Sequence, residues 1–274
     1  MLIDSHAHLT LPEFHDTLDE TLNRAWQQGL SAIITVGIDE RDSFRAVGLA
    51  ERHDRIFATV GIHPHDVKNI GHSTYEKLKI LAANDKVVAY GEIGLDFFRN
   101  RSPREEQLRR FGEQLEIAYD AGLPVVIHDR EAHGETMAML KPWKAKLRGV
   151  LHCFSGDCSL ATAFIDLGFY ISIPGAVTFS KAVEMQEVAR RIPLDSMLVE
   201  TDAPFLAPVP FRGRNNEPSY IVHTAQRIAD LRKTSFAAVA SATAHNAENL
   251  FSLPSGERGE TAQDKILASQ STME

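Results

Sequence analysis

Short apolar runs alternate with amphipathic stretches along most of the chain. The apolar runs predict strands at residues 2–8, 31–37, 56–62, 87–95, 124–128, 149–154, 169–173 and 197–201. Stretches with a helical repeat of apolar positions follow them at residues 16–29, 40–53, 73–83, 103–121, 132–140, 159–167 and 182–191, with two more at 219–232 and 236–250. Runs without polar alternation, such as 31–37, are typical of parallel strands buried on both faces. Eight strand-then-helix units predict an α/β fold, a TIM-type (β/α)8 barrel.

The pattern contains no break that would mark a domain boundary. The chain has 274 residues, and a barrel of this type typically needs about 250. We therefore expect a single domain, a barrel over residues 1–252. Residues 253–274 are polar and have little apolar periodicity, so we expect a disordered tail there.

The formal net charge of −8 argues against a broad basic surface for long nucleic acid. A phosphate substrate stays open, because divalent cations would reverse the field inside a site. The two cysteines, Cys153 and Cys158, offer no disulfide framework and fit a reducing compartment. We recognise no signal peptide and no apolar run long enough to span a membrane. These features predict a cytoplasmic protein without a membrane partner; we favour a monomer, although the sequence does not determine the oligomeric state.

The first predicted strand carries two histidines, His6 and His8. Side chains two residues apart project from the same face of a strand, so these imidazoles form half of a metal site. The pair alone does not exclude two unrelated histidines near a chain terminus.

Other ligand-type residues fall at the carboxyl ends of later strands, where the active sites of βα barrels lie. They are His63 and His65 after the third strand, Glu92 at the end of the fourth, His128 at the end of the fifth, His152 in the sixth and Asp202 at the end of the eighth. Imidazoles and carboxylates without thiolates suit Zn²⁺, Mn²⁺, Fe²⁺ or Mg²⁺. The set exceeds what one ion needs, and two ions about 3.5–4 Å apart, sharing a carboxylate, would clamp a phosphoryl group.

Seven stretches of the chain resemble the TatD family of metal-dependent deoxyribonucleases, within the amidohydrolase-like barrels. They are Asp4-Ser-His-Ala-His8, Gly61-Ile-His-Pro-His65, Gly91-Glu-Ile-Gly-Leu-Asp96, Pro124-Val-Val-Ile-His128, His152-Cys-Phe-Ser-Gly156, Glu200-Thr-Asp-Ala-Pro204 and Arg212-Gly-Arg-Asn-Asn-Glu-Pro218. They occur in the order of the family and cover residues 2 to about 252. Together they are specific, although the His-x-His motif alone is shared by many amidohydrolases.

The resemblance implies roles for individual residues around two divalent ions. His6, His8 and Asp202 would hold one ion, His128 and His152 the other, and Glu92 would bridge them. A metal-activated water would be the nucleophile, and Asp202 has a second plausible role as its proton acceptor. By the same resemblance, His63 would contact the scissile phosphate, a contact that a protonated imidazole could make; the alternative is a loop histidine that caps the next helix.

Several polar residues keep two interpretations. Arg212, Arg214 and Asn215 could clamp a substrate phosphate, since a guanidinium binds phosphate oxygens as a fork, or could anchor a surface loop through ion pairs. Glu200 and Asp4 could orient metal ligands or form salt bridges inside the barrel. A group of phenylalanines in predicted loops could stack on nucleobases but more often would pack the barrel rim; it comprises Phe97, Phe98, Phe154, Phe179, Phe205 and Phe211.

The leading hypothesis is a deoxyribonuclease that trims single-stranded DNA ends as an exonuclease. The alternative keeps the metal site and changes the substrate to small phosphoesters, carboxyesters or amides, which the acidic composition favours. A metal-dependent scaffold without catalysis would predict gaps in the ligand set, and we find none. The sequence leaves open whether the substrate is DNA or RNA, from which end the strand is attacked and which metal is bound.

Overall fold

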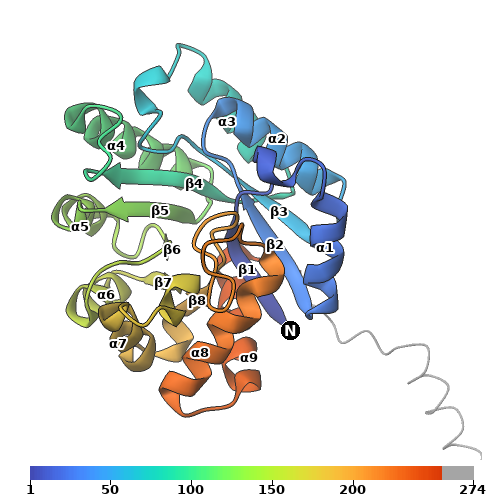
Figure 1. Ribbon diagram of the computed structural model, residues 1–274. Helices are drawn as coiled ribbons and strands as arrows, with labels where there is room; N and C mark the ends of the chain where they lie inside the picture. The colour runs from blue at the N-terminus through green and yellow to red at the C-terminus, as the bar shows by residue number, and fades with distance from the viewer. Residues whose placement is uncertain (255–274) are drawn as a thin grey trace, which may run out of the picture.

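The computed structural model describes residues 1–254, and its centre is one parallel sheet of eight strands. In chain order these are β1 (Leu2–Ala7), β2 (Leu30–Val36), β3 (Ile56–Val60), β4 (Val87–Asp96), β5 (Val125–Arg130), β6 (Gly149–Leu151), β7 (Phe169–Ile173) and β8 (Met197–Val199). Each strand pairs in parallel with the next. Figure 1 shows the strands at the centre of the molecule and the helices around them. The predicted barrel, a single domain, is confirmed.

Every predicted helix is present, with ends shifted by a few residues at most. They are α1 (Leu18–Gln27), α2 (Glu40–Glu51), α3 (Thr74–Ala82), α4 (Arg104–Asp120), α5 (His133–Leu140), α6 (Cys158–Asp166), α7 (Val183–Arg191), α8 (Ile221–Arg232) and α9 (Phe236–Phe251). Asp39 and Asp157 accept backbone N–H groups at the first turns of α2 and α6, as N-caps do. Within residues 1–254, no helix is long and apolar enough to cross a bilayer.

The carboxyl ends of the strands differ from the prediction by up to three residues. Strands β4 and β5 continue to Asp96 and Arg130, beyond the expected ends, whereas β6 and β8 are only three residues long. After the two short strands the backbone leaves the extended conformation, and Cys153 and Asp202 have φ angles of 45° and 55°. Residues other than glycine rarely adopt this left-handed region, and such positions often cluster at functional sites.

The barrel closes where the segment after β8 meets β1. The N–H of Asp202 donates to the carbonyl of His6 at 2.9 Å, and the N–H of His8 donates to the carbonyl of Ala203 at 2.8 Å. The buried carboxylate of Asp4 accepts the N–H of Thr201 at 2.9 Å and its hydroxyl at 2.6 Å. This seam holds the ends of the two chain segments that carry His6, His8 and Asp202 next to each other.

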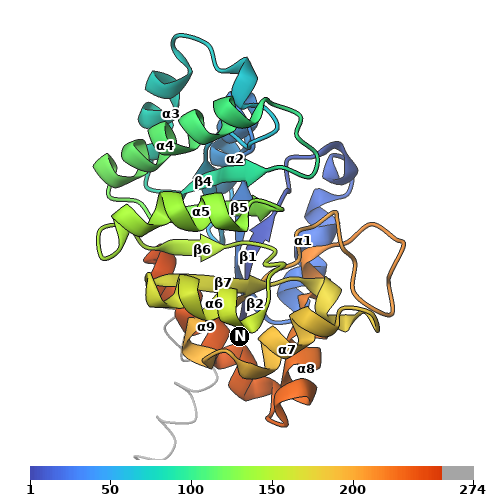
Figure 2. The same cartoon turned by 90° about the vertical axis from the view of Figure 1, so that its left-hand side faces the viewer.

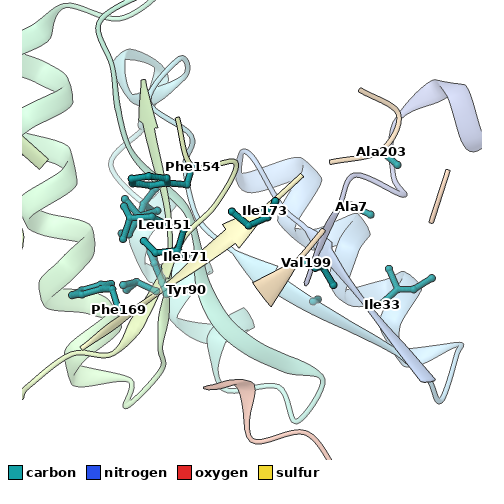
Figure 3. Close-up of a cluster of buried hydrophobic side chains, with 14 of the residues drawn as sticks. Ala7, Ile33, Tyr90, Leu151, Phe154, Phe169, Ile171, Ile173, Val199 and Ala203 are labelled. Carbon is teal, nitrogen blue, oxygen red and sulfur yellow. The ribbon is translucent and has the colours of Figure 1, made fainter. Parts of the chain in front are cut away.

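The opposite end of the barrel is filled by hydrophobic side chains. Ile3, Val126 and Leu198, from the first halves of their strands, cluster with Ala247 and Phe251 of α9. Leu253, in the predicted tail, is buried in the same cluster; residues 255–274 of that tail lie outside the described residues. A larger cluster packs the helices onto the strands, and Figure 3 shows part of it, with labelled residues from six strands and the adjoining loops.

Glycines in the matching stretches let neighbouring strands approach. Gly94 has a φ of 136°, and a Cβ atom at this position would lie 2.1 Å from the carbonyl oxygen of His128. A Cβ atom on Gly91 would lie 2.7 Å from Val126. The backbone of β4 therefore passes close to β5 on both sides of Glu92, which brings this carboxylate next to His128.

Candidate metal centre

The side chains expected to bind metal gather at the carboxyl end of the barrel. They come from β1, β4 and β5 and from the residues that follow β6 and β8. Glu92 lies four residues before the end of β4 and is buried, rather than at the strand end as expected. In Figure 2 the orange loop that follows β8 projects from the same end of the barrel as the loop that follows β4.

One group of ligand atoms surrounds a point between β1, β4 and the end of β8. Nε2 of His6 lies 3.2 Å from Nε2 of His8 and 3.4 Å from Oε2 of Glu92. Oδ1 of Asp202 lies 3.3 Å from Nε2 of His8 and 3.8 Å from Nε2 of His6. Nε2 of His8 is 3.9 Å from Oε2 of Glu92.

A second group surrounds the other oxygen of the same carboxylate. Oε1 of Glu92 lies 2.7 Å from Nδ1 of His128, 3.2 Å from Nε2 of His152 and 3.4 Å from Nε2 of His63. The two oxygens of Glu92 therefore face different sets of imidazoles, which is the arrangement that a bridging carboxylate needs.

The spacing of these atoms fits divalent cations. Ligand atoms at 2.0–2.2 Å from a tetrahedral Zn²⁺ lie about 3.3–3.6 Å from one another. The five spacings in the first group, 3.2 to 3.9 Å, bracket that range. In addition, Nε2 of His6 and Nε2 of His8 face each other, and two imidazole nitrogens that converge in this way are well placed to share a cation. The described residues thus contain clustered groups able to hold metal.

The protonation of the buried carboxylates also suits a cation. Burial is the largest effect on Glu92 and raises its pKa, but the neighbouring charges of His152 and His63 and the hydrogen bonds from histidines hold the pKa well below its ordinary value. Burial likewise raises the pKa of Asp202, yet the hydrogen bond with His8 and the charges of nearby histidines lower it overall. Both groups are therefore ionised at neutral pH, which is the form that binds metal.

One of two carboxylates outside the ligand set contacts a candidate ligand. Nδ1 of His152 lies 3.2 Å from Oε1 of Glu200, and the same oxygen accepts the backbone N–H of Cys153 at 2.7 Å. Glu200 thus contacts a candidate ligand, one of its two expected roles. Asp4 contacts the backbone N–H of His6 and not the imidazole ring, so it supports the barrel seam instead.

Asp96 contacts two histidines of the candidate site, and the sequence analysis did not single it out. Its Oδ2 lies 3.1 Å from Nε2 of His128 and 2.8 Å from Nε2 of His65, and the side chain is fully buried. A ligating histidine typically donates its second ring N–H to such a carboxylate. The signal was present in the sequence, because Asp96 follows Glu92 by four residues and therefore shares its face of a regular strand.

His63 lies inside the site, and its nitrogens have different surroundings. Nδ1 accepts the backbone N–H of His65 at 3.1 Å. Burial lowers the pKa of His63 to about 4, so the neutral ring predominates at pH 7 and not the protonated ring that could also contact a phosphate. With Nδ1 as an acceptor, the proton of the neutral ring lies on Nε2, which becomes a hydrogen-bond donor next to Glu92.

The three residues of the predicted phosphate clamp lie in an exposed loop that a neighbouring side chain fixes to the site. Arg212, Arg214 and Asn215 are exposed, and the Arg212 guanidinium lies 4.4 Å from the ring centre of Phe179. The buried neighbour Asn216, which the sequence analysis did not single out, donates to the carbonyls of Thr201 and Phe205 at 2.7 Å. Asn216 therefore fastens this loop one residue from Asp202.

The phenylalanines of the predicted loops divide into three groups by exposure. Phe97 and Phe154 are buried and pack the rim. Phe98 and Phe205 are about half exposed, and the Phe205 ring centre lies 5.9 Å from that of His8. Phe179 and Phe211 are intermediate, and Phe211 stacks on Tyr220.

Comparisons with known proteins agree with this site. A family model described as TatD related DNase matches residues 3–252. An uncharacterized metal-dependent hydrolase, YabD, of Bacillus subtilis is 40% identical over 252 residues, covering 92% of this chain and 99% of its own. The 3'-5' ssDNA/RNA exonuclease TatD of Escherichia coli K12 is 39% identical over 258 residues, with the same coverage of each. The crystal structure of YJJV, a TatD homologue from E. coli K12, has a TM-score of 0.88 at 32% identity and covers 92% of this chain and 98% of that chain.

The barrel, the clustered candidate ligands and the relatives together define the class of this protein, which is a metal-dependent hydrolase. Within that class, the chain belongs to the TatD related DNase family, which confirms the resemblance carried by the seven stretches.

Proposed function

We propose that this protein is an exonuclease that removes nucleotides from single-stranded ends in the 3'-5' direction with two divalent cations. The observation that carries the proposal is the division of the Glu92 oxygens between two groups of imidazoles, 2.7–3.4 Å away on one side and 3.4–3.9 Å on the other. The relatives named 3'-5' ssDNA/RNA exonuclease support the substrate and the polarity.

The six candidate ligands divide between the two positions. His6, His8 and Asp202 would hold one ion, His128 and His152 the other, and Glu92 would contact both. When bound, such ions polarise phosphoryl oxygens and supply a water-derived nucleophile at neutral pH. This chemistry cleaves a phosphodiester without a covalent enzyme intermediate.

Asp202 is the proposed proton acceptor. Its side chain is 13% exposed, whereas those of His6, His8 and Glu92 are 0%, 6% and 3% exposed. The lowered pKa of Asp202 keeps the carboxylate ionised and able to accept a proton from the attacking water.

His63 and the loop after β8 are proposed to bind the substrate. The Nε2–H of neutral His63 would donate to a non-bridging oxygen of the scissile phosphate. Arg212, Arg214 and Asn215 would contact phosphates further along the strand, because an exposed guanidinium can bind phosphate oxygens as a fork.

The proposal is tested with the purified protein, supplied with Zn²⁺, Mn²⁺ or Mg²⁺, on single-stranded DNA and RNA labelled at the 5' or the 3' end. We expect stepwise shortening from the 3' end, and we expect Glu92→Ala and His128→Ala to abolish it while circular dichroism stays unchanged. A small phosphodiester and a carboxyester are assayed in parallel. Turnover of these esters without cleavage of DNA or RNA would overturn the nuclease proposal and support the alternative, a hydrolase of small esters. Full activity of the two variants at saturating metal would overturn the site.

A reducing, cytoplasmic location is part of the same proposal. Cys153 and Cys158 are both free thiols, although they are only five residues apart in the chain. Burial raises the pKa of the Cys153 thiol well above its ordinary value, which keeps it protonated and unreactive beside the site. Fractionation of cells that express the protein tests the location directly.

A further inference from the structure

Arginines and a phenylalanine form a group on the rim beyond β4 and β5. The Phe98 ring is 50% exposed. The guanidinium carbon of Arg130 lies 4.2 Å from its centre, and that of Arg99 lies 5.6 Å from it. Both arginines are themselves exposed. We call Phe98, Arg99 and Arg130 the Phe98 platform.

The platform is attached directly to the metal centre. The N–H of Arg99 donates to Oδ1 of Asp96 at 2.6 Å, and Oδ2 of the same carboxylate contacts His128 at 3.1 Å. The N–H of Phe97 donates to the carbonyl of Arg130 at 2.9 Å, which joins the two rim segments. The residues next to Phe98 in the chain are therefore joined through one side chain, that of Asp96, to the candidate ligand His128.

The arginines of the platform differ from other arginines of the described residues in their ion pairing. Other arginines, such as Arg24, Arg109 and Arg110, form ion pairs with glutamates at 2.6–3.0 Å. Within residues 1–254, no carboxylate lies within 4.0 Å of the guanidinium nitrogens of Arg99 or Arg130. In a chain with a net charge of −8, two such arginines beside an exposed aromatic ring are matched to an anionic, flat ligand.

We propose that the Phe98 platform binds the nucleotide next to the scissile linkage, with Phe98 stacked on its base and Arg99 and Arg130 in contact with its phosphates. This subsite deepens the proposed nuclease function and rests on it. Every base has an aromatic face, so stacking accepts any sequence. A base within a duplex is already stacked and paired, so the platform selects single strands.

The first test measures binding, with a chelator present so that no cleavage occurs. The probe is a fluorescent oligothymidylate, and its anisotropy is followed for the wild type, Phe98→Ala and Phe98→Trp. We expect Phe98→Ala to bind roughly tenfold more weakly, as loss of one base–aromatic stack does, and Phe98→Trp to keep the affinity. Phe44→Ala is the matched control, since Phe44 is 69% exposed on α2 and lies outside the rim.

Two further measurements separate stacking from a structural role. On an oligomer of abasic sites, Phe98→Ala and the wild type should bind equally, because no base remains to stack. Replacement of Arg99 or Arg130 by alanine should reduce the slope of log affinity against log salt by about 0.7 for each phosphate that the arginine neutralises. The control variant Phe44→Ala should hydrolyse a small phosphodiester at the wild-type rate.

The outcomes distinguish the platform from the nuclease function. The platform is overturned if Phe98→Ala binds oligothymidylate like the wild type, if it loses the same affinity on the abasic oligomer, or if the wild type does not bind at all. Binding that depends on Phe98, without any cleavage of DNA or RNA once metal is added, would instead overturn the proposed exonuclease and leave a single-strand binding site.

Discussion

At the scale of single residues, the site depends on carboxylates that each contact several groups. Glu92 places one oxygen in each group of imidazoles, Glu200 holds His152 and the backbone of Cys153, and Asp96 holds His128 and His65. Such contacts fix both the direction of an imidazole and which nitrogen carries its proton. Small changes to them should therefore alter metal binding more than stability.

Asp96→Asn is expected to weaken metal binding about 10- to 100-fold, the range for residues that orient metal ligands. The amide keeps the size of the side chain but loses the charge that faces His128. Calorimetric titration with Zn²⁺ or Mn²⁺ measures the effect, and Asp85→Asn on the exposed surface is the control. Unchanged affinity in Asp96→Asn would show that His128 does not need this carboxylate.

At the scale of elements, close strand pairing and short junctions position the ligands. The glycines of β4 let it approach β5, and the backbone after β6 and β8 turns through left-handed residues into the barrel mouth. At the carboxyl end of β5, Asp129 is joined to the first residue of α5 by a contact of 2.7 Å with Nδ1 of His133. The strand pairing and the β5–α5 junction can each be tested by one substitution.

Gly94→Ala should destabilise the protein by more than about 3 kcal/mol, because a φ of 136° disfavours a side chain and the new Cβ atom would overlap the carbonyl of His128. Gly122→Ala provides the matched comparison: its φ is 67°, but nothing lies within 4 Å of the added atom. Gly122→Ala should lower the free energy of unfolding by only about 1–2 kcal/mol. Urea denaturation measures both, and equal losses would contradict the close approach of β4 and β5.

His133→Gln should make stability less dependent on pH. The hydrogen bond with Asp129 raises the pKa of His133 above its ordinary value. The contact therefore stabilises the native state fully below the pKa of the unfolded chain, and this stabilisation is lost as the pH rises through the pKa of the folded state. The variant should be about 0.5 kcal/mol less stable at pH 5.5, as expected for a partly exposed pair, and closer to the wild type at pH 9. Urea denaturation at the two pH values measures the free energies of unfolding of the variant and the wild type. A difference between the two proteins that is the same at both pH values would exclude an ionic contribution of His133.

At the scale of the whole molecule, the two ends of the barrel differ in the side chains that fill them. Helix α9 and the residues Ile3, Val126 and Leu198 fill one end with apolar side chains, whereas the other end concentrates imidazoles and carboxylates. Among residues 1–254, the side chains paired with the acidic ligands Glu92 and Asp202 are imidazoles. Bound cations should therefore stabilise the entire domain.

Addition of metal at 100 times its dissociation constant should stabilise the native state by about 2.7 kcal/mol. For a domain of this size, that raises the Tm by roughly 5–10 °C. Differential scanning calorimetry with chelator and with added Zn²⁺ or Mn²⁺ measures the shift. Glu92→Ala should lose most of it, and an equal shift in that variant would place the ions elsewhere.

The sequence by itself determined the order of elements, the barrel and the residues that reach its mouth. These features depend on local patterns: apolar periodicity, helix caps and polar residues at strand ends, which parallel strands bring to a common edge. The tertiary structure decided how those residues meet. Whether Glu92 divides its oxygens, whether Asp96 reaches His128, and whether Asn216 rather than Asn215 anchors a loop depend on strand register and on backbone conformations such as that of Asp202. Contacts between residues distant in sequence follow from this packing, which no local pattern contains.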